Sequence, residues 1–302
     1  MSFPIITADQ RMNDRRGIKG AIFGKSGIGK TSLLWTVDAQ STLFFDLEAG
    51  DLAVEDWPGD TIRPRTWQAC RDFAVYIGGP NPALREDQPY SQAHYDAVCR
   101  QFGDPTALSQ YDTIFIDSIT VAGRLCLQWC KGQPQAFSER TGKPDTRGAY
   151  GLHGQEMIAW LTHLQHTRNK NIWFVGILDE RIDDFNRKVH VPQIDGSKTA
   201  LELPGIVDQV ITMAEVTGDN GEPCRAFVTH TLNAYGYPAK DRSGRLAPLE
   251  EPHLGRLMDK IRGPVRPALE RLRFDHPEAG STSSPSVEPH ALSISSSEGD
   301  AV

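Results

Sequence analysis

The sequence predicts an α/β fold in which a mostly parallel central sheet is flanked by helices. Short apolar runs of strand length alternate with helix-like apolar spacings along most of the chain, which is the order that builds parallel sheets. Several of the apolar runs end in a glycine-rich turn or in a carboxylate. Because ligands bind at the carboxyl ends of the strands in open α/β sheets, these endings predict where the functional site lies.

The glycine-rich turn matches the pattern G-x-x-x-x-G-K-[ST] in full. A strand is expected before it, over residues 18–23, and a helix after it, over residues 32–37. Backbone N–H groups of such a turn bind phosphate oxygens. Lys30 is expected to reach the β- and γ-phosphates, and the Thr31 hydroxyl to ligate Mg²⁺. The residues expected to contact the nucleotide are Gly24, Lys25, Ser26, Gly27, Ile28, Gly29, Lys30, Thr31 and Ser32. The sequence therefore predicts a site for a nucleoside triphosphate and Mg²⁺, and the absence of a guanine-reading N-K-x-D sequence favours ATP over GTP.

Two carboxylates follow the next expected strand, residues 41–46. Asp46 ends this strand and Glu48 lies two residues beyond it. A carboxylate at the carboxyl end of a strand is placed to orient a water molecule against a γ-phosphate. An acid in a surface loop fits the same spacing, so both interpretations of Glu48 stay open on spacing alone.

A further acid ends the apolar, β-branched strand expected over residues 111–118. Asp117 follows Thr31 by 86 residues, with strands and helices between them. This is the Walker B arrangement, in which the carboxylate accepts from Mg²⁺-bound water or from the hydroxyl in the phosphate loop. The sequence therefore predicts Thr31 and Asp117 as the magnesium pair.

The remaining chain supplies further elements, an insert and two ends. The other expected strands are residues 60–64, 171–178, 206–216 and 224–230, the last two as a hairpin that adds a C-terminal meander, and the other expected helices are 66–77, 91–102, 119–130, 155–166 and 253–262. Residues 80–107 are interpreted as an insert without visible chemistry, residues 1–16 as a flexible lead-in, and 263–302 as a Ser/Pro-rich tail that buries too little apolar surface to fold. The domain is thus expected over residues 17–262.

Two polar loops carry cations next to aromatic rings. In the loop over residues 131–151 these are Lys131, Phe137, Arg140, Lys143, Arg147 and Tyr150, and in the loop over residues 181–204 they include Phe185, Arg187 and Lys188. Cations for phosphates and rings for base stacking are the components of a single-stranded nucleic acid groove. A solvated charged loop explains the first pattern nearly as well, and the second loop has a negative net charge. Further on, Lys240 and Arg242 are separated by a single residue. They could reach a neighbouring subunit's nucleotide or equally be solvated loop charges, and both interpretations stay open.

Composition limits the function classes. The net charge is −7, so nucleic acid has to be held by a local patch rather than by a global basic field. The five cysteines show no paired C-x-x-C spacing, which argues against a zinc site. No secretory leader and no membrane-length apolar run is present. The chain is therefore expected to be cytoplasmic, in a bacterial host if it is phage-encoded, with no membrane partner.

Taken together, residues 17–262 resemble the RecA-like P-loop NTPase core, and within it the small phage-encoded ATPases that assist single-strand annealing and recombination. The segments that carry the resemblance are "GKSGIGKT", "FFDLEAG", "YDTIFIDSIT" and "AKDRSG". The resemblance implies that Glu48 is the catalytic base, that loops 131–151 and 179–204 bind DNA, and that Lys240 and Arg242 act on a neighbour's ATP. The fourth strand departs from the RecA pattern, because Gly176-Ile177-Leu178 and Asp179 stand where a polar sensor, usually Gln, is expected.

The leading functional hypothesis is an ATP-hydrolysing recombination or annealing factor on single-stranded DNA. It implies self-association into a ring or filament with ATP at the subunit interfaces, and a single-strand DNA-binding protein as a further partner. The alternative is a ParA/MinD-like switch ATPase, in which Lys25 would reach across a dimer. A small-molecule kinase would need a lid with arginines, for which the insert offers only Arg85 and Arg100. A nucleotide-binding interaction module without hydrolysis is the remaining alternative.

Overall fold

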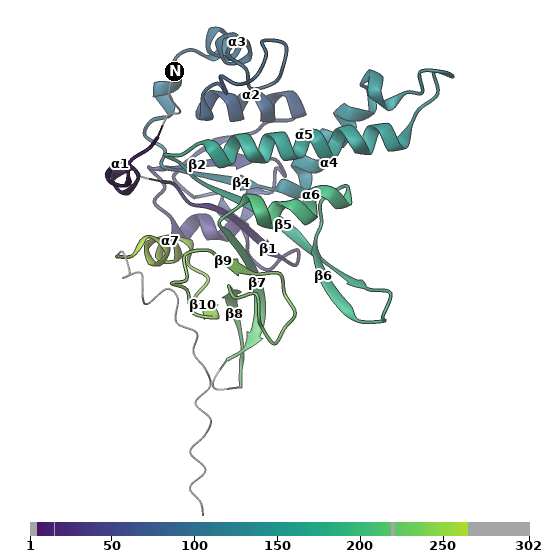
Figure 1. Cartoon of the computed structure of the whole chain (residues 1–302). Helices are drawn as coiled ribbons and strands as arrows, with labels where there is room; N and C mark the ends of the chain where they lie inside the picture. Colours follow the sequence, from purple (N-terminus) through teal and green to yellow (C-terminus); the bar gives the residue numbers. More distant parts are fainter. Residues whose placement is uncertain (1–4, 15, 219–220, 265–302) are drawn as a thin grey trace, which may run out of the picture. The chain divides into compact units, whose positions relative to one another are not determined.

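The computed structural model describes residues 5–14, 16–218 and 221–264. In this part of the chain the strands form one ten-stranded sheet in the order β10-β8-β7-β1-β5-β4-β2-β3, with β6 paired to β5 and β9 paired to β7 (Figure 1). The strands are β1 (Lys19–Gly24), β2 (Thr42–Asp46), β3 (Asp60–Ile62), β4 (Thr113–Asp117), β5 (Asn171–Ile182), β6 (Lys188–Pro192), β7 (Gln209–Thr217), β8 (Pro223–Val228), β9 (Lys240–Asp241) and β10 (Leu249–Glu250). Strands β1 to β5 and β7 pair in parallel, whereas β6, β8, β9 and β10 pair antiparallel. The predicted α/β class, with its RecA-like P-loop core and antiparallel C-terminal strands, is confirmed.

Helices cover both faces of the parallel part of the sheet (Figure 1). The α-helices are α1 (Ala8–Asn13), α2 (Trp67–Gly78), α3 (Gln92–Phe102), α4 (Ile119–Lys131), α5 (Thr146–His166), α6 (Ser197–Ile206) and α7 (Leu254–Arg262), and the 3₁₀ helices are η1 (Thr31–Thr36), η2 (Asp51–Val54), η3 (Pro105–Leu108) and η4 (Pro134–Ala136). Successive residues of a strand face opposite sides. Phe45 accordingly packs in the core under α2, α4 and α5, and Phe44 in the core under η1 and α7. None of the helices in the described residues is long and apolar enough to cross a bilayer.

Side-chain caps explain why three predicted helices begin where they do. The hydroxyls of Thr66, Ser91 and Ser118 accept hydrogen bonds from backbone N–H groups in the first turns of α2, α3 and α4, respectively. Each cap satisfies a donor that the helix itself leaves unpaired. The predicted starts of these three helices are confirmed.

The segment after the phosphate loop is a 3₁₀ helix, η1, and not the α-helix that its apolar face predicts. The Thr36 hydroxyl donates to the Leu33 carbonyl over 2.7 Å and accepts from the N–H of Leu254 over 2.9 Å. Side-chain bonds to nearby carbonyls compete with continued helix hydrogen bonding. Val37 then adopts an extended conformation and ends the segment.

Helix α5 begins at Thr146, well before the predicted start at residue 155. The Asp145 carboxylate caps it by accepting from the N–H of Arg147 over 2.9 Å. Glycines disfavour helices, and Gly148, Gly151 and Gly154 therefore make the sequence before residue 155 look non-helical. Gly148 is nevertheless required by packing. A Cβ there would lie 2.1 Å from the carbonyl oxygen of Gln135. The predicted loop 131–151 therefore ends at residue 145.

The predicted loop over residues 179–204 is also regular structure. Strand β5 continues to Ile182 and pairs with β6 from Leu178↔Pro192 to Ile182↔Lys188, and α6 follows. We call residues 178–192 the arm, which extends beyond the parallel sheet (Figure 1). Its outer part is exposed and charged, so it lacks the buried apolar run on which strand prediction rests.

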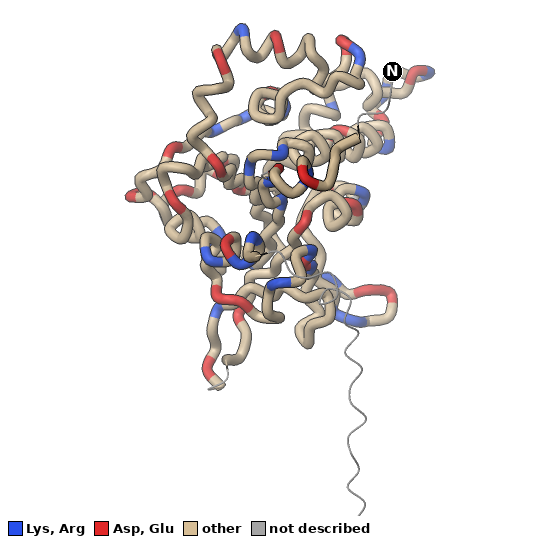
Figure 2. The backbone as a smooth tube through the Cα atoms, turned by 60° about the vertical axis from the view of Figure 1, so that its left-hand side comes forward, with Lys and Arg blue, Asp and Glu red and all other residues tan. Residues whose placement is uncertain are grey.

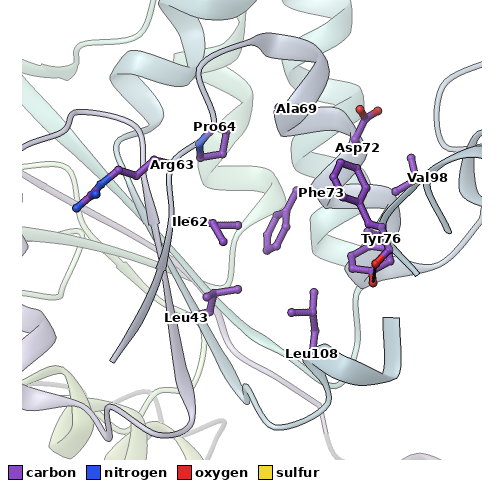
Figure 3. A pocket seen from close by; sticks show the side chains of 11 residues that line it. Leu43, Ile62, Arg63, Pro64, Ala69, Asp72, Phe73, Tyr76, Val98 and Leu108 are labelled. Carbon is purple, nitrogen blue, oxygen red and sulfur yellow. Dashed lines mark hydrogen bonds between the residues drawn. The ribbon is translucent and has the colours of Figure 1, made fainter. Parts of the chain in front are cut away.

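An apolar pocket lies at the edge of the sheet, lined by β2, β3 and α2, and the insert over residues 80–107 contributes Val98 and Phe102 to it. Helix α3 packs on α2, and η3 follows. The pocket has a volume of about 350 Å³, and Figure 3 shows its apolar lining, including Leu43, Ile62, Phe73, Tyr76 and Leu108, around a common space. Its lining includes none of the predicted site residues.

The two chain ends differ in how much is described. In the predicted lead-in, α1 has no buried residue. The predicted tail over residues 263–302 lies outside the described residues, apart from its first two positions.

We expect His163 to make folding sensitive to acid. Its ring, on α5, stacks on Tyr90 at 4.5 Å between centroids, and burial lowers its pKa to about 4. Between pH 6.5 and 4 the unfolded chain therefore takes up a proton that the folded chain does not. The contribution of His163 to the free energy of unfolding is present above pH 6.5 and falls, by at most about 3 kcal/mol, as the pH drops to 4. Urea denaturation at several pH values should show a weaker pH dependence for His163→Gln than for wild type, and equal slopes would contradict this assignment.

Candidate nucleotide site

The phosphate loop connects β1 to η1 at the carboxyl end of the sheet. Gly27 and Gly29 have φ angles of 79° and 99°, a region that side chains other than glycine rarely enter. At Gly24 a Cβ would lie 2.6 Å from the Met213 carbonyl oxygen of β7. The glycines are therefore required by the turn and by its close approach to β7.

Lys30 is held inside the loop. Its ammonium donates to the carbonyl oxygens of Gly24, over 3.0 Å, and Lys25, over 2.9 Å. Burial lowers its pKa, and the nearby carboxylates of Asp117 and Glu48 oppose that effect. The cation is thus confined to the turn whose N–H groups are suited to phosphate, and its contact with the β- and γ-phosphates stays a prediction.

The Thr31 hydroxyl donates to Asp117 over 2.6 Å. Asp117 ends β4 and pairs in register with Asp46 at the end of β2. Burial raises the pKa of Asp117 to about 6 because the charged form loses hydration. A hydroxyl beside a buried carboxylate fits Mg²⁺, which also takes oxygen ligands from phosphates and water. In the part of the chain that the structure describes, no cluster of three or more His, Cys, Asp or Glu offers another metal site.

Glu48 lies in the turn that follows β2. The Ser118 hydroxyl, next to Asp117, donates to its carboxylate. Asp46 shapes the turn by accepting from the Ala49 N–H over 2.8 Å and from Arg63 over 3.1 Å. The structure therefore brings Glu48 to the Asp117 end of the phosphate site and assigns Asp46 a structural part.

Comparison with known protein families assigns this chain to one of them. The model of an AAA domain family, AAA_24, matches residues 16–243. The chain belongs to this family. The match makes it a P-loop ATPase, and such ATPases bind nucleotide with Mg²⁺.

This AAA-domain chain was also compared with curated proteins and with solved structures. No curated protein matches it. Among solved structures it is similar to a prototypical ATPase from the type III secretion system of pathogenic bacteria, at 13% identity and a TM-score of 0.34 over 66% of this chain. The chain spans 51%, about half, of that ATPase chain.

Arg225 of β8 is a cation at the phosphate loop that sequence patterns do not reveal. A Cβ on Gly29 would lie 2.8 Å from its guanidinium Nη1. β8 pairs with β7, and β7 pairs with β1, so the arginine reaches the loop across one intervening strand, β7. The sequence signal that could have indicated Arg225 is the predicted hairpin: if its first strand, β7, pairs with β1, its second strand brings Arg225 toward the phosphate loop.

We expect Arg225 to support ATP binding by adding positive charge beside the phosphates. Arg225→Gln should weaken ATP affinity about 10-fold, the effect of one charge-assisted hydrogen bond, as measured by titration with a fluorescent ATP analogue. Arg256→Gln, an exposed arginine on α7, is the matched control. Equal affinities for Arg225→Gln and wild type would show that the guanidinium is not used.

Lys240 and Arg242 lie at the opposite end of the sheet from their own phosphate loop. They are in or next to β9, which pairs with the first residues of β7. The Lys240 ammonium donates to the Pro204 and Val207 carbonyls at the end of α6, and Arg242 pairs with Asp208 over 3.0 Å. Within one chain these contacts hold Lys240 and Arg242 against the connection between α6 and β7. A role on a neighbour's ATP stays a prediction.

The predicted DNA-binding residues fall into two groups, one over residues 131–147 and one in the arm. Lys131 ends α4, Phe137 pairs with Pro144 in an isolated bridge, and Arg147 is on α5. Arg140 and Lys143 lie between them and are exposed. Figure 2 shows basic and acidic positions interspersed along the chain, so any nucleic acid contact has to be local.

In the arm, both predicted cations have acidic partners. Arg187 pairs with Asp183 over 2.7 Å and Lys188 with Glu180 over 2.8 Å; both cations and Glu180 are exposed, whereas the Asp183 side chain is partly buried. Lys188 lowers the pKa of Glu180, and the charge of Lys25 in the phosphate loop contributes to the same lowering. The arm is therefore close enough to the phosphate loop for their charges to interact.

Proposed function

We propose that this chain hydrolyses ATP at the phosphate loop and that single-stranded DNA is its partner. The observation that supports hydrolysis most directly is that Asp117 at the end of β4 and Glu48 in the turn after the adjacent β2 lie beside Lys30 and Thr31. A water-orienting carboxylate, a metal ligand and a phosphate cation are then present together.

In the proposed reaction, Glu48 orients a water molecule for in-line attack on the γ-phosphate and accepts its proton. The Ser118 hydroxyl holds the Glu48 carboxylate in place. Lys30 stabilises the charge that develops on the phosphate oxygens, and Arg225 adds charge from β8. Thr31 and Asp117 would hold Mg²⁺, which would supply positive charge for the β- and γ-phosphate oxygens.

Single-stranded DNA is proposed to bind over residues 131–147 and the arm. The first segment ends in the first turn of α5, whose far end leads into the start of β5, and the arm continues β5 beyond its parallel part. Both segments therefore lie toward the same end of the sheet as the phosphate loop, where the parallel strands finish. Both extend on the right in Figure 1. Exposed Arg140 and Lys143 beside Phe137 supply charge and a stacking surface.

This placement offers a route from nucleotide to DNA that does not need the sensor glutamine of RecA proteins. Residues 176–178 carry no such side chain. Gly24 of the phosphate loop pairs with Ile177 of β5, directly before the arm, and this strand connects the phosphate loop with the arm instead. The proposed setting is phage recombination or annealing, with self-association into a ring or filament and a single-strand DNA-binding protein as partner, as the RecA resemblance implies.

The test of the DNA part is a salt titration of oligo(dT) binding, read by fluorescence anisotropy in the presence of ATP and Mg²⁺. Replacing Arg140 and Lys143 together by Gln should make the slope of log affinity against log salt shallower by about 1.4, since each phosphate contact on single strands contributes about 0.7. Arg100 and Arg256 replaced by Gln remove the same charge elsewhere and serve as the control. No binding by wild type at low salt would refute the DNA proposal and leave the ATPase proposal intact.

A further inference from the structure

A second cavity lies at the opposite end of the sheet from the phosphate loop. Its volume is about 360 Å³, and its walls come from the residues before β1, the start of β7, the residues after β9 and the end of α7. In the register of β1 and β7, Gly20 pairs with Gln209, whereas Gly24 lies at the far end of β1. The cavity is therefore separate from the nucleotide site of the same chain.

Four arginines and one carboxylate line this cavity, which we call the arginine cavity. Asp208 accepts from Arg16 over 2.9 Å and from Arg242 over 3.0 Å, both at Oδ1. Arg262 donates to the Asn171 side chain over 2.8 Å, and Arg245 donates to the Ile261 carbonyl over 2.7 Å. The lining thus has three positive charges in excess in a chain of net charge −7.

Such a gathering of like charges costs electrostatic free energy, which a bound anion offsets. Guanidinium groups match phosphate oxygens in shape and bind them with paired, charge-assisted hydrogen bonds. The side chains of Arg16 and Arg242 are 53% and 45% exposed, so both have N–H groups within reach of a ligand. Beside the cavity, burial lowers the pKa of Lys19 to about 8, Asp208 opposes this lowering, and Arg16 and Arg168 add to it.

We propose that the arginine cavity is a second anion site, which binds a phosphate-bearing group. The group has two conceivable sources with the same chemistry: a free small phosphate compound, or the phosphates of a nucleotide held by a second copy of this chain. The second source rests on the proposed self-association. Pyrophosphate is a suitable probe because it presents two linked phosphates to several guanidinium groups.

Calorimetric titration with pyrophosphate tests the site in a Lys30→Ala background, which weakens binding at the phosphate loop. Adding Arg16→Gln and Arg262→Gln should raise the Kd for pyrophosphate at least 10-fold. Arg256→Gln is the matched control, because Arg256 is on α7 as well but pairs with Glu251 outside the cavity lining. Its Kd should stay within twofold. Arg16 is exposed, so Arg16→Gln alone keeps the test valid if the double variant is unstable.

Light scattering with ATP and Mg²⁺, with Lys30 intact, distinguishes the two sources. A free phosphate compound is the source if pyrophosphate binds and the cavity variants weaken it, whether or not ATP is hydrolysed. A partner's nucleotide is the source if pyrophosphate does not bind but the cavity variants, and not Arg256→Gln, reduce ATP-dependent self-association. If the cavity variants change neither measurement, the proposal is wrong. A failure of ATP hydrolysis alone would overturn the proposed function and leave the pyrophosphate result standing.

Discussion

Glu48→Gln is expected to lower the rate of ATP hydrolysis by about 100-fold or more, because a positioned general base contributes about 10²–10⁴-fold. Glutamine has nearly the same shape and still accepts a hydrogen bond from the Ser118 hydroxyl, so the turn after β2 is expected to keep its conformation. It cannot accept the proton of the attacking water. ATP affinity should therefore stay within about twofold of wild type, since the phosphate contacts of Lys30 and the loop N–H groups are unchanged.

Phosphate release at saturating ATP and Mg²⁺, together with a fluorescent-nucleotide titration, measures the two quantities separately. Glu55→Gln is the matched control, because Glu55 is an exposed acid seven positions further along the same connection. It should leave both the rate and the affinity unchanged. A Glu48→Gln rate close to that of wild type would mean that Glu48 is a surface acid and that another group orients the water.

Lys30→Ala is expected to weaken ATP binding by about 100-fold, corresponding to roughly 2.7 kcal/mol, within the range for charge-assisted hydrogen bonds to phosphate. Two causes act together. The variant loses the cation for the phosphates, and the Gly24 and Lys25 carbonyls lose the ammonium that they accept from. Isothermal titration with a slowly hydrolysed ATP analogue and Mg²⁺ measures the change.

Lys25→Ala in the same loop is both the control and the test of the alternative function. Lys25 is exposed, so ATP affinity should change little when its side chain is removed. In a ParA/MinD-like switch, Lys25→Ala would abolish nucleotide-driven dimerisation, which size-exclusion chromatography detects. Similar ATP affinities for Lys30→Ala and wild type would contradict the assignment of the phosphate loop.

The central part of the site could be predicted from the sequence because its information is local. The spacing of the loop glycines determines where Lys30 and Thr31 lie, and apolar runs locate the carboxyl ends of β2 and β4. Parallel register then brings Asp46 and Asp117 level with each other. Residues at neighbouring strand ends are close whatever the rest of the fold does.

Other features depend on tertiary contacts that no local pattern encodes. Arg225 reaches Gly29 only because the C-terminal hairpin joins the sheet beside β1. The start of α5 was obscured by glycines, one of which packs under Gln135. The arginine cavity combines side chains as far apart in sequence as Arg16 and Arg262, and its charge is invisible in a chain whose overall balance is acidic.

The measurement that tests the account most directly is the rate of ATP hydrolysis by the wild-type chain with Mg²⁺, with and without oligo(dT), beside the same pair of assays on Glu48→Gln. We expect Mg²⁺-dependent hydrolysis that oligo(dT) stimulates, with both rates lost in the variant. Hydrolysis that ignores DNA would contradict the proposed partner and favour the switch ATPase. Nucleotide binding with no hydrolysis under either condition would contradict the enzymatic claim and leave a nucleotide-binding module.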